Sequence, residues 1–286
     1  MAIAAMRAGK HVYIDKPLAV TAESADRIAE VADECDVFTR MVFNNRYSPA
    51  ILRAKQLVEE GKIGDILTFN ARYLHAGSID PNRPIGWKQQ MQGGVLLDLG
   101  SHALDLLTWM IGYPENVMCK MRTLYNDRPT KEGGRETALS EDHVSMMLEM
   151  PNGAVGCVEA SKIATGTNDE LSLEIYGTKG ALRWNGMDAN YVYYFDQTKP
   201  EAPLGGERGF TRIESVGRYP APGGVFIPSK MSIGWERGHM HCYFTFLNSI
   251  AKGEKPEGSI RDGVRLQHLM EKLQQSAATG AWVKAE

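Results

Sequence analysis

The sequence contains only four cysteines, and no two of them are close together. Cys35, Cys119, Cys157 and Cys242 show no Cys-x-x-Cys spacing and fall in segments with helix-like or strand-like patterns. Isolated thiols of this kind are typical of a reducing compartment, and they argue against a disulfide framework or a cysteine-rich zinc site. We therefore expect reduced cysteines and a cytoplasmic protein.

The chain also lacks a long apolar run and an excess of charge of either sign. The opening segment, Met1 to Lys10, is apolar but short, and Arg7 interrupts it. No other stretch approaches the ~20 apolar residues that a membrane-spanning helix needs. Lys and Arg number 32 against 35 Asp and Glu, a net charge of -3, so there is no basic field to attract nucleic acid or anionic lipid. We expect neither nucleic acid nor a membrane as a partner.

The chain does contain enough apolar residues, 43% of 286, to form the core of one large domain or two ordinary ones. Up to residue 43 it alternates between helix and strand patterns. A helix is predicted over 2–8, a strand over 11–15, a second helix after the capping residue Thr21, and a second strand over 37–43. This order is typical of a parallel, doubly wound sheet, of which only two strands are present.

From Asn44 onwards the pattern changes to that of an antiparallel sheet with helices. Alternating apolar residues and turn signals predict strands within 65–75, 144–161, 171–185 and 190–196. The Gly- and Pro-rich stretch 199–234 is expected to be a loop. Two helices, near 240–251 and 262–279, are predicted to close the chain.

The segment 93–112 holds the clearest candidates for chemistry. In a helix entered through its two leading glycines, Asp98, His102, Asp105 and Trp109 follow at spacings of four, three and four, and so share one face. A polar stripe turned to water is the plain alternative. The stripe is sparse, however, and suits the wall of a polar pocket, where Asp98 would fix the orientation and tautomer of His102 for acid-base work.

Lys16, at the end of the strand predicted over 11–15, is the second candidate. A solvated lysine is the common alternative at a strand end. In a doubly wound sheet, however, ligands bind in the crevice at the carboxyl ends of the strands. A lysine there can polarise a substrate oxygen, and its charge would lower the pKa of a neighbouring histidine.

Four segments resemble signatures of the Gfo/Idh/MocA oxidoreductases, named for glucose-fructose oxidoreductase and inositol dehydrogenase. They are AGKHVYIDKPLA, NNRYSP, GGVLLDLGSHALD and LEIYGTKGALRW, and they occur in the expected order. The resemblance implies an α/β fold in which residues 1–43 are a remnant of a doubly wound Rossmann domain. Residues 44–286 would form an α+β domain with a large, open, mainly antiparallel sheet, which in this family often builds oligomers.

The resemblance further implies hydride transfer between NAD or NADP and a carbon of a sugar or polyol. The family's Asp-x-x-x-His pair falls on Asp98 and His102, and the lysine of its Glu-Lys-Pro motif on Lys16. In the expected mechanism His102 takes the proton of a substrate hydroxyl while hydride leaves the same carbon. Lys16 stabilises the developing alkoxide, and Asp98 orients His102.

Residues that would hold the cofactor also follow from the resemblance. Asp15 and Lys16 stand where relatives have Glu and Lys, which is a conservative departure. Asn44 and the pair Trp87 and Lys88, where relatives often have Trp-Arg, match positions that contact the cofactor in several members.

One expected signature is absent, because no two of the 29 glycines are separated by a single residue. The chain therefore contains no Gly-x-Gly, and the dinucleotide fingerprint Gly-x-Gly-x-x-Gly is missing. We expect the fingerprint to belong to a segment that precedes this sequence in its relatives, and we expect the chain by itself to bind NAD(P) poorly. Two alternatives to a dehydrogenase stay open: an NAD-dependent glycosidase or lyase that oxidises its sugar transiently, and a non-catalytic sheet module that associates with itself or with a full-length relative.

The segment HMHC, which begins at His239, raises the question of a metal. His239 and His241 lie two residues apart and would diverge on a helix, and no further ligand cluster accompanies them. We expect no metal site, and we expect one of these histidines to lie at the edge of the substrate pocket.

Overall fold

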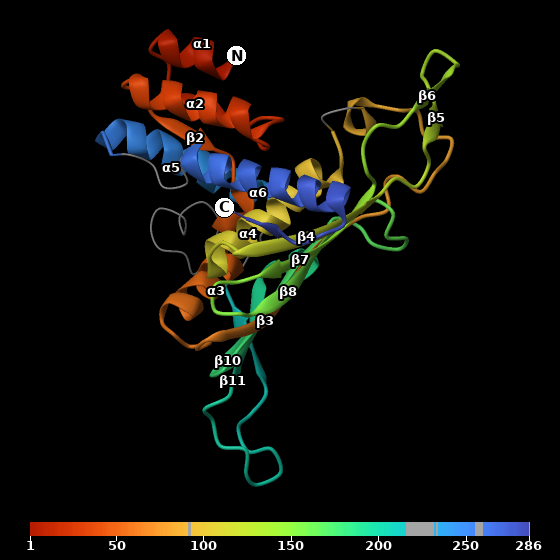
Figure 1. Ribbon diagram of the computed structural model, residues 1–286. Helices are drawn as coiled ribbons and strands as arrows, with labels where there is room; N and C mark the ends of the chain where they lie inside the picture. Colours follow the sequence, from red (N-terminus) through yellow and green to blue (C-terminus); the bar gives the residue numbers. More distant parts are fainter. Residues whose placement is uncertain (91–92, 216–231, 233, 255–259, 286) are drawn as a thin grey trace.

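The structure is a computed structural model that describes residues 1–90, 93–215, 232, 234–254 and 260–285. The chain begins with a small parallel unit of two helices and two strands (Figure 1). These elements are α1 (Ala2–Arg7), β1 (Val12–Ile14), α2 (Ala22–Glu34) and β2 (Thr39–Met41). The two strands pair in parallel. Their carboxyl ends therefore lie side by side, which brings the residues that follow them to one place.

A nine-stranded sheet forms most of the remaining structure. Its strands are β3 (Ile66–Leu74), β4 (Asn116–Arg122), β7 (His143–Glu149), β8 (Val155–Ser161), β9 (Glu170–Gly177), β10 (Gly180–Asn185), β11 (Tyr191–Asp196), β12 (Phe210–Glu214) and β13 (Val283–Lys284). Their order in the sheet is β12-β11-β10-β9-β3-β8-β7-β4-β13. Every pair is antiparallel except β3 with β8, which is parallel. A separate small hairpin joins β5 (Asp127–Pro129) and β6 (Arg135–Thr137).

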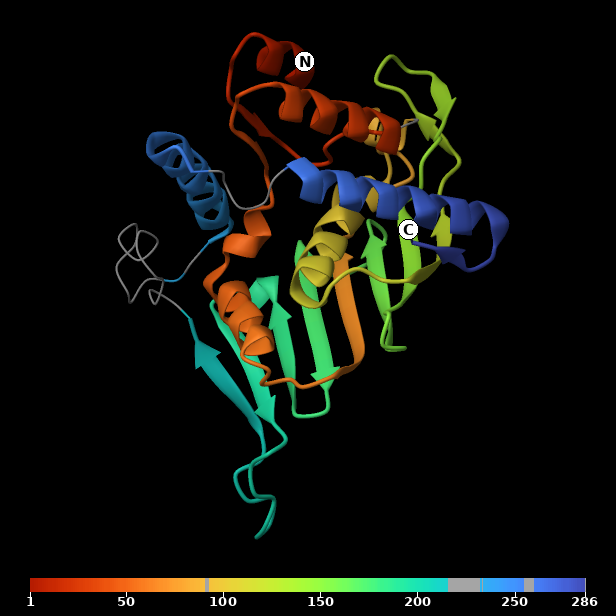
Figure 2. The same ribbon diagram turned by 60° about the vertical axis from the view of Figure 1, so that its left-hand side comes forward.

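Three helices cover one face of this sheet, as Figure 2 shows for α3 and α4. They are α3 (Pro49–Glu59), α4 (Ser101–Ile111) and α6 (Ile260–Thr279). Buried residues of α4, such as Leu104 and Leu107, join Phe69 of β3 and Ile175 of β9 in one hydrophobic core. Helix α6 also contacts α2, so it fastens the small parallel unit to the sheet. In both views no described helix lies over the opposite face.

Helix α5 (Trp235–Lys252) lies beside β1 and the short 3-10 helix η1 (Asn44–Tyr47). Aromatic contacts join it to β1, with the Tyr13 ring 5.4 Å from that of Tyr243 and 5.5 Å from that of Phe246. Helix α5 therefore reaches the point where the parallel unit and the sheet meet.

No described helix is both long enough and apolar enough to cross a membrane.

The α/β class, the Rossmann-like beginning and the large sheet are confirmed. Two local predictions were wrong. Part of the expected loop 199–234 is the strand β12. This strand is short, alternates polar residues and lies in a Gly-rich segment, so its sequence resembles that of a loop. Residues 216–231 and 233 of the expected loop lie outside the described residues. The helix expected from residue 93 begins instead with a π-helical turn, Leu96–Gly100, that leads into α4.

Candidate active site

The carboxylate of Asp98 lies among three lysine side chains. Its Oδ1 is 3.2 Å from Lys16 Nζ, and its Oδ2 is 2.7 Å from Lys88 Nζ and 2.8 Å from Lys162 Nζ. Lys16 Nζ also donates to the backbone carbonyl of Asp98. The side chains of Asp98, Lys16 and Lys162 are 13%, 15% and 6% exposed, so these three are largely out of water, whereas the side chain of Lys88 is 42% exposed.

Each member of the cluster comes from a different element. Lys16 follows β1, Lys88 lies in the 3-10 helix η2 (Trp87–Gln89), and Lys162 follows β8. Asp98 lies in the π-helical turn. A π-turn inserts one residue into the helical ladder and often occurs at functional sites. The cluster joins the end of the small parallel unit to the end of a sheet strand.

Charge dominates the ionisation of this cluster. Burial alone would raise the pKa of the Asp98 carboxyl, but attraction to Lys162 and Lys16 outweighs burial and holds the pKa well below its usual range. Burial lowers the pKa of Lys162, and Asp98 opposes that shift. Three lysines around one carboxylate leave the cluster with an excess of positive charge beside the neighbouring histidine.

That histidine, His102, occupies the second position of α4. Its Nδ1 is 3.1 Å from Nδ2 of Asn45, and its ring centroid is 5.6 Å from that of Tyr73. Burial first, and then the charge of Lys16, lower the pKa of His102 to about 3. The imidazole is therefore neutral at neutral pH, which is the state a general base requires.

The expected direct contact between Asp98 and His102 is replaced by two separate arrangements. Among the hydrogen bonds of the described residues, Asp98 pairs with lysines and His102 with Asn45. The π-turn explains the difference, because it removes Asp98 from the spacing of four that would stack it beneath His102 in an α-helix. We therefore correct the expectation that Asp98 orients the His102 ring directly.

The other members of the expected polar stripe are also engaged elsewhere. Asp105 is buried, and Arg46 of η1 binds both of its carboxylate oxygens, at 2.5 and 3.1 Å. The Arg46 guanidinium lies 5.5 Å from the Trp109 ring. These side chains thus face other parts of the protein. The alternative interpretation, a polar helix face exposed to water, is wrong.

The residues expected to hold the cofactor lie in part at this site. Lys16 is in the cluster, and Asn44, three residues after the end of β2, is 3% exposed. Asp15 is exposed, and its Oδ1 accepts the backbone N–H of Lys16 at 2.9 Å. Lys88 joins the cluster through Asp98, whereas the side chain of Trp87 lies outside the described residues. Lys16 and Asn44 follow neighbouring parallel strands, the position at which such sheets hold ligands, so the residues present fit the reacting end of a dinucleotide.

An open pocket of about 250 Å³ is lined by Asn45 and Tyr73, both of which contact the His102 ring. Aromatic and apolar side chains form much of its wall, and Asn44, Asn45, Ser48 and Asp169 supply polar groups. The apolar wall comes from Tyr73, Leu171, Trp184, Met187, Ala189 and Trp235. Aromatic faces with a few convergent polar groups are suited to a sugar or polyol, which has both apolar C–H faces and hydroxyls.

Helix α5 contributes to this pocket through Trp235 and Gly238. The ring of His239 lies 4.4 Å from that of Trp235, which lines the pocket. The expectation that His239 or His241 lies at the pocket edge stays a prediction. His241 points instead to Tyr47, 5.0 Å away between ring centroids. In the part of the chain that the structure describes, no group of three or more His, Cys, Asp or Glu could hold a metal ion.

Comparison with known proteins places this site in a family. Residues 1–43 match the model of an oxidoreductase family with an NAD-binding Rossmann fold, and residues 51–183 match the GFO/IDH/MocA C-terminal domain. Levoglucosan dehydrogenase from Pseudarthrobacter phenanthrenivorans is 30% identical over 302 residues, which cover 99% of this chain and 76% of that enzyme. The chain belongs to the Gfo/Idh/MocA family.

The other relatives include an inositol dehydrogenase and proteins described only as oxidoreductases. Myo-inositol 2-dehydrogenase from Thermotoga maritima is 26% identical over 264 residues, 92% of this chain and 69% of that enzyme. Among solved structures, levoglucosan dehydrogenase in complex with NADH and levoglucosan has a TM-score of 0.91 at 31% identity, covering 99% of this chain and 76% of that one. An oxidoreductase domain protein from Kribbella flavida reaches a TM-score of 0.93 at 30% identity, with coverage of 100% and 77%.

Lys162 is one of the site residues that were not predicted from the sequence, and Asn45 is another. Lys162 follows Ser161 at the end of a well-predicted hairpin strand, where a solvated lysine is the ordinary expectation. Its burial depends on the parallel pairing of β8 with β3, which brings the end of β8 next to the π-turn. Sequence pattern alone carries no signal for that pairing.

Replacing Asp98 by Asn keeps the shape of the side chain and removes the charge that the three lysines share. We expect the free energy of unfolding at pH 7 to fall by roughly 3 kcal/mol, because the lysines would then be left without their counter-charge. The folded-state pKa of Asp98 is depressed, so this stability is present above about pH 4 and is lost as the pH falls through the folded-state value.

The matched control is Asp127→Asn, at the exposed ion pair with Arg135, which should cost less than about 1 kcal/mol. Urea unfolding measures both variants. Equal losses at the two positions would contradict a special role for Asp98.

Proposed function

We propose that this protein is an NAD(P)-dependent oxidoreductase that acts on a hydroxyl-bearing carbon of a sugar or polyol. The observation that carries the proposal is the neutral imidazole of His102 beside the fixed positive charge of Lys16, next to an aromatic pocket with polar groups. A base and a fixed cation are the two groups that oxidation of an alcohol requires of the protein. The named activities of the levoglucosan and inositol relatives support the same class of substrate.

In the proposed mechanism His102 accepts the proton of the reacting hydroxyl at the nitrogen that does not face Asn45. Lys16 stabilises the negative charge that develops on the oxygen, and Asp98 holds Lys16 in place at 3.2 Å. The bound nicotinamide would supply the hydride acceptor, with Lys16 and Asn44 holding its reacting end. The pocket next to His102 keeps the substrate in reach, with polar contacts from Asn44 and Asp169.

The test is a His102→Gln variant, assayed with a panel of sugars and polyols that includes levoglucosan and myo-inositol. Formation of NADH or NADPH is followed by absorbance. We expect turnover to fall by roughly 10²-fold or more with a smaller change in KM, since the lost group acts in proton transfer. The control is His143→Gln, on the sheet strand β7, where the ring contacts Ser145 at 2.8 Å.

Unchanged turnover in His102→Gln would remove His102 from the mechanism. Cleavage of a glycoside without accumulation of NADH would instead favour transient oxidation by a glycosidase or lyase. Activity that follows NADH formation mole for mole would eliminate that alternative.

Cofactor binding is a separate question, because the 286-residue chain contains no Gly-x-Gly. We propose that this chain alone binds NADH and NADPH weakly, since the glycines that admit a pyrophosphate to a helix N-terminus are absent from it. Titration with NADH and with NADPH, followed by tryptophan fluorescence, gives the affinity and the preference for either cofactor. Saturable binding at micromolar concentrations would show that the residues present suffice.

We also propose that the chain self-associates through the sheet face that no described helix covers. Met147 and Val155 lie on that face and are 38% and 42% exposed. Self-association would bury such apolar side chains in a symmetric interface.

Within the same proposal, residues 1–43 and 44–286 form the two domains. The four cysteines, all free thiols, support a cytoplasmic location.

A further inference from the structure

The short helix η1 is fixed against α4 by a buried ion pair. Arg46 donates to both carboxylate oxygens of Asp105, at 3.1 and 2.5 Å, and a third nitrogen donates to Asp262 of α6 at 2.9 Å. Arg46 is 9% exposed, and its guanidinium stacks 4.4 Å from the Phe43 ring. A two-pronged pair of this kind sets direction as well as distance. The neighbouring residue, Asn45, is thereby held at a fixed position relative to His102, three residues before Asp105.

The amide of Asn45 determines where the neutral His102 ring carries its proton. Asn45 Nδ2 faces His102 Nδ1 at 3.1 Å, and Asn45 Oδ1 faces Nδ2 of Asn44 at 3.5 Å. With the amide oriented in this way, Nδ1 accepts a hydrogen bond, so the ring proton is on Nε2. No described residue hydrogen-bonds Nε2. Nε2 is therefore the nitrogen left to meet a substrate oxygen.

A ring with its proton on Nε2 can donate to a substrate oxygen but cannot take a proton from it. To act as a base at Nε2, the neutral ring must carry its proton on Nδ1, and that proton needs an acceptor. Asn45 Oδ1 would supply the acceptor after the amide turns over, while the ring gives its Nε2 proton to a solvent water and takes one from water at Nδ1, with no change in net charge. The contact from Asn44 that holds the present orientation is 3.5 Å long, at the limit of a hydrogen bond, so little opposes the turn.

We propose that Asn45 is the positioning residue of His102, and that its amide selects between a resting ring protonated on Nε2 and a base-competent ring protonated on Nδ1. The inference rests on the proposed function for its catalytic meaning, but the tautomer is a property of the free protein. It also assigns to Asn45 the orienting task that the sequence had indicated for Asp98.

Other groups that act on His102 come from several elements. They are Lys16 after β1, Asp98 in the π-turn, Lys88 in η2, Tyr73 of β3 and His239 of α5. None of these is altered by a substitution at position 45. A change in the behaviour of His102 in such a variant can therefore be assigned to the contact with Nδ1.

The decisive variant is Asn45→Asp, because a carboxylate can only accept. It should fix the proton on Nδ1 and raise the pKa of His102 by roughly 1 to 3 units. The first measurement is ¹⁵N NMR of the imidazole in the substrate-free protein, with the His102 signals assigned by their loss in His102→Gln. We expect the Nε2–H form in the native chain and the Nδ1–H form in Asn45→Asp.

The second measurement is the pH dependence of kcat/KM with the best substrate of the panel. In Asn45→Asp, the acidic limb of the kcat/KM profile should move to higher pH, by the same roughly 1 to 3 pH units. Asn45→Leu, which offers no hydrogen bond, should lower kcat about 10-fold or more, because the base-competent ring loses its acceptor, with little change in KM. Asn82→Asp adds the same charge in an exposed loop and should leave the limb in place.

An unchanged tautomer and an unchanged limb in Asn45→Asp would overturn the proposal, as would an Nδ1–H ring in the native chain. Equal losses of activity in all Asn45 variants without movement of the limb would show a merely structural role. If His102 is not the base of the proposed reaction, His102→Gln will keep full turnover. That result would not change the tautomer measured by NMR in the substrate-free protein.

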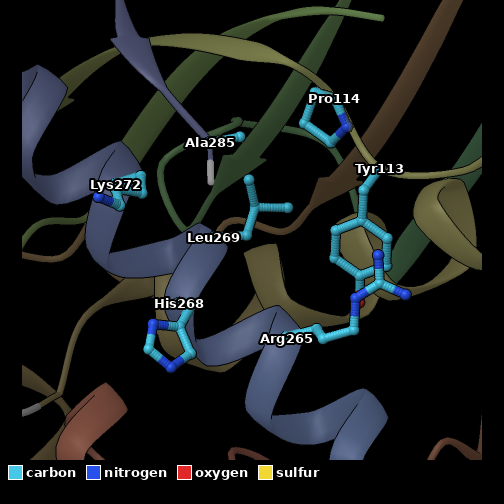
Figure 3. A pocket seen from close by; sticks show the side chains of 7 residues that line it. All are labelled: Tyr113, Pro114, Arg265, His268, Leu269, Lys272 and Ala285. Atoms are coloured by element: carbon cyan, nitrogen blue, oxygen red, sulfur yellow. The ribbon is translucent and has the colours of Figure 1, made fainter. Parts of the chain in front are cut away.

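A second pocket, of about 300 Å³, lies beside helix α6. Figure 3 shows Arg265, His268 and Lys272 of α6 around it, with Tyr113 opposite Arg265. Two of these side chains already have partners: Arg265 stacks 4.0 Å from the Tyr113 ring, and His268 lies 3.0 Å from Asp26. Nothing in the structure indicates what would occupy this pocket, and it carries no proposal.

Discussion

The structure of the site depends on the charge of one carboxylate. Three ammonium groups from separate elements approach Asp98 within 3.2 Å, and without that carboxylate they would repel one another, with Lys16 and Lys162 largely buried. Because Lys16 comes from the parallel unit and Lys162 from the sheet, the same carboxylate also links the two parts of the chain. Lys16 is thereby fixed where its charge, together with burial, keeps His102 neutral.

A second ion pair, between Arg46 and Asp105, complements the lysine cluster around Asp98. Arg46 and Asp105 hold η1 against α4, and this contact places Asn45 at Nδ1 of the ring. The lysines around Asp98 thus set the charge near the imidazole, and the Arg46–Asp105 pair sets its hydrogen bonding. Together they explain how His102 can be neutral, held in position and still free at one nitrogen.

Much of the fold could be predicted from the sequence because its signals are local. The capping residue Thr21, the alternation from Val144 to Met150 and the Pro-Asn-Gly turn each specify one element. The strand β12 was not predicted because none of its side chains is buried, so the sequence shows no apolar face. Its place in the sheet depends on pairing with β11.

The candidate site could be predicted only in part. Lys16, Asp98 and His102 were found from their positions, yet their partners were not, since these depend on contacts between distant segments. A π-turn cannot be read from residue spacing, so the tie between Asp98 and His102 was inferred from α-helical geometry that the chain does not adopt there. The burial of Lys162 and the contact of Asn45 with His102 likewise arise from packing.

The ionisation of Asp98 tests this account most directly. Side-chain ¹³C NMR of the carboxyl, assigned by its loss in Asp98→Asn, can be followed between about pH 5.5 and about pH 3.5, where an ordinary aspartate takes up its proton. The account predicts that Asp98 remains a carboxylate over this whole range, because the neighbouring lysines hold its pKa well below the usual value. Protonation of Asp98 within this range, near its ordinary pKa, would show that the three lysines do not hold its charge and would contradict the account.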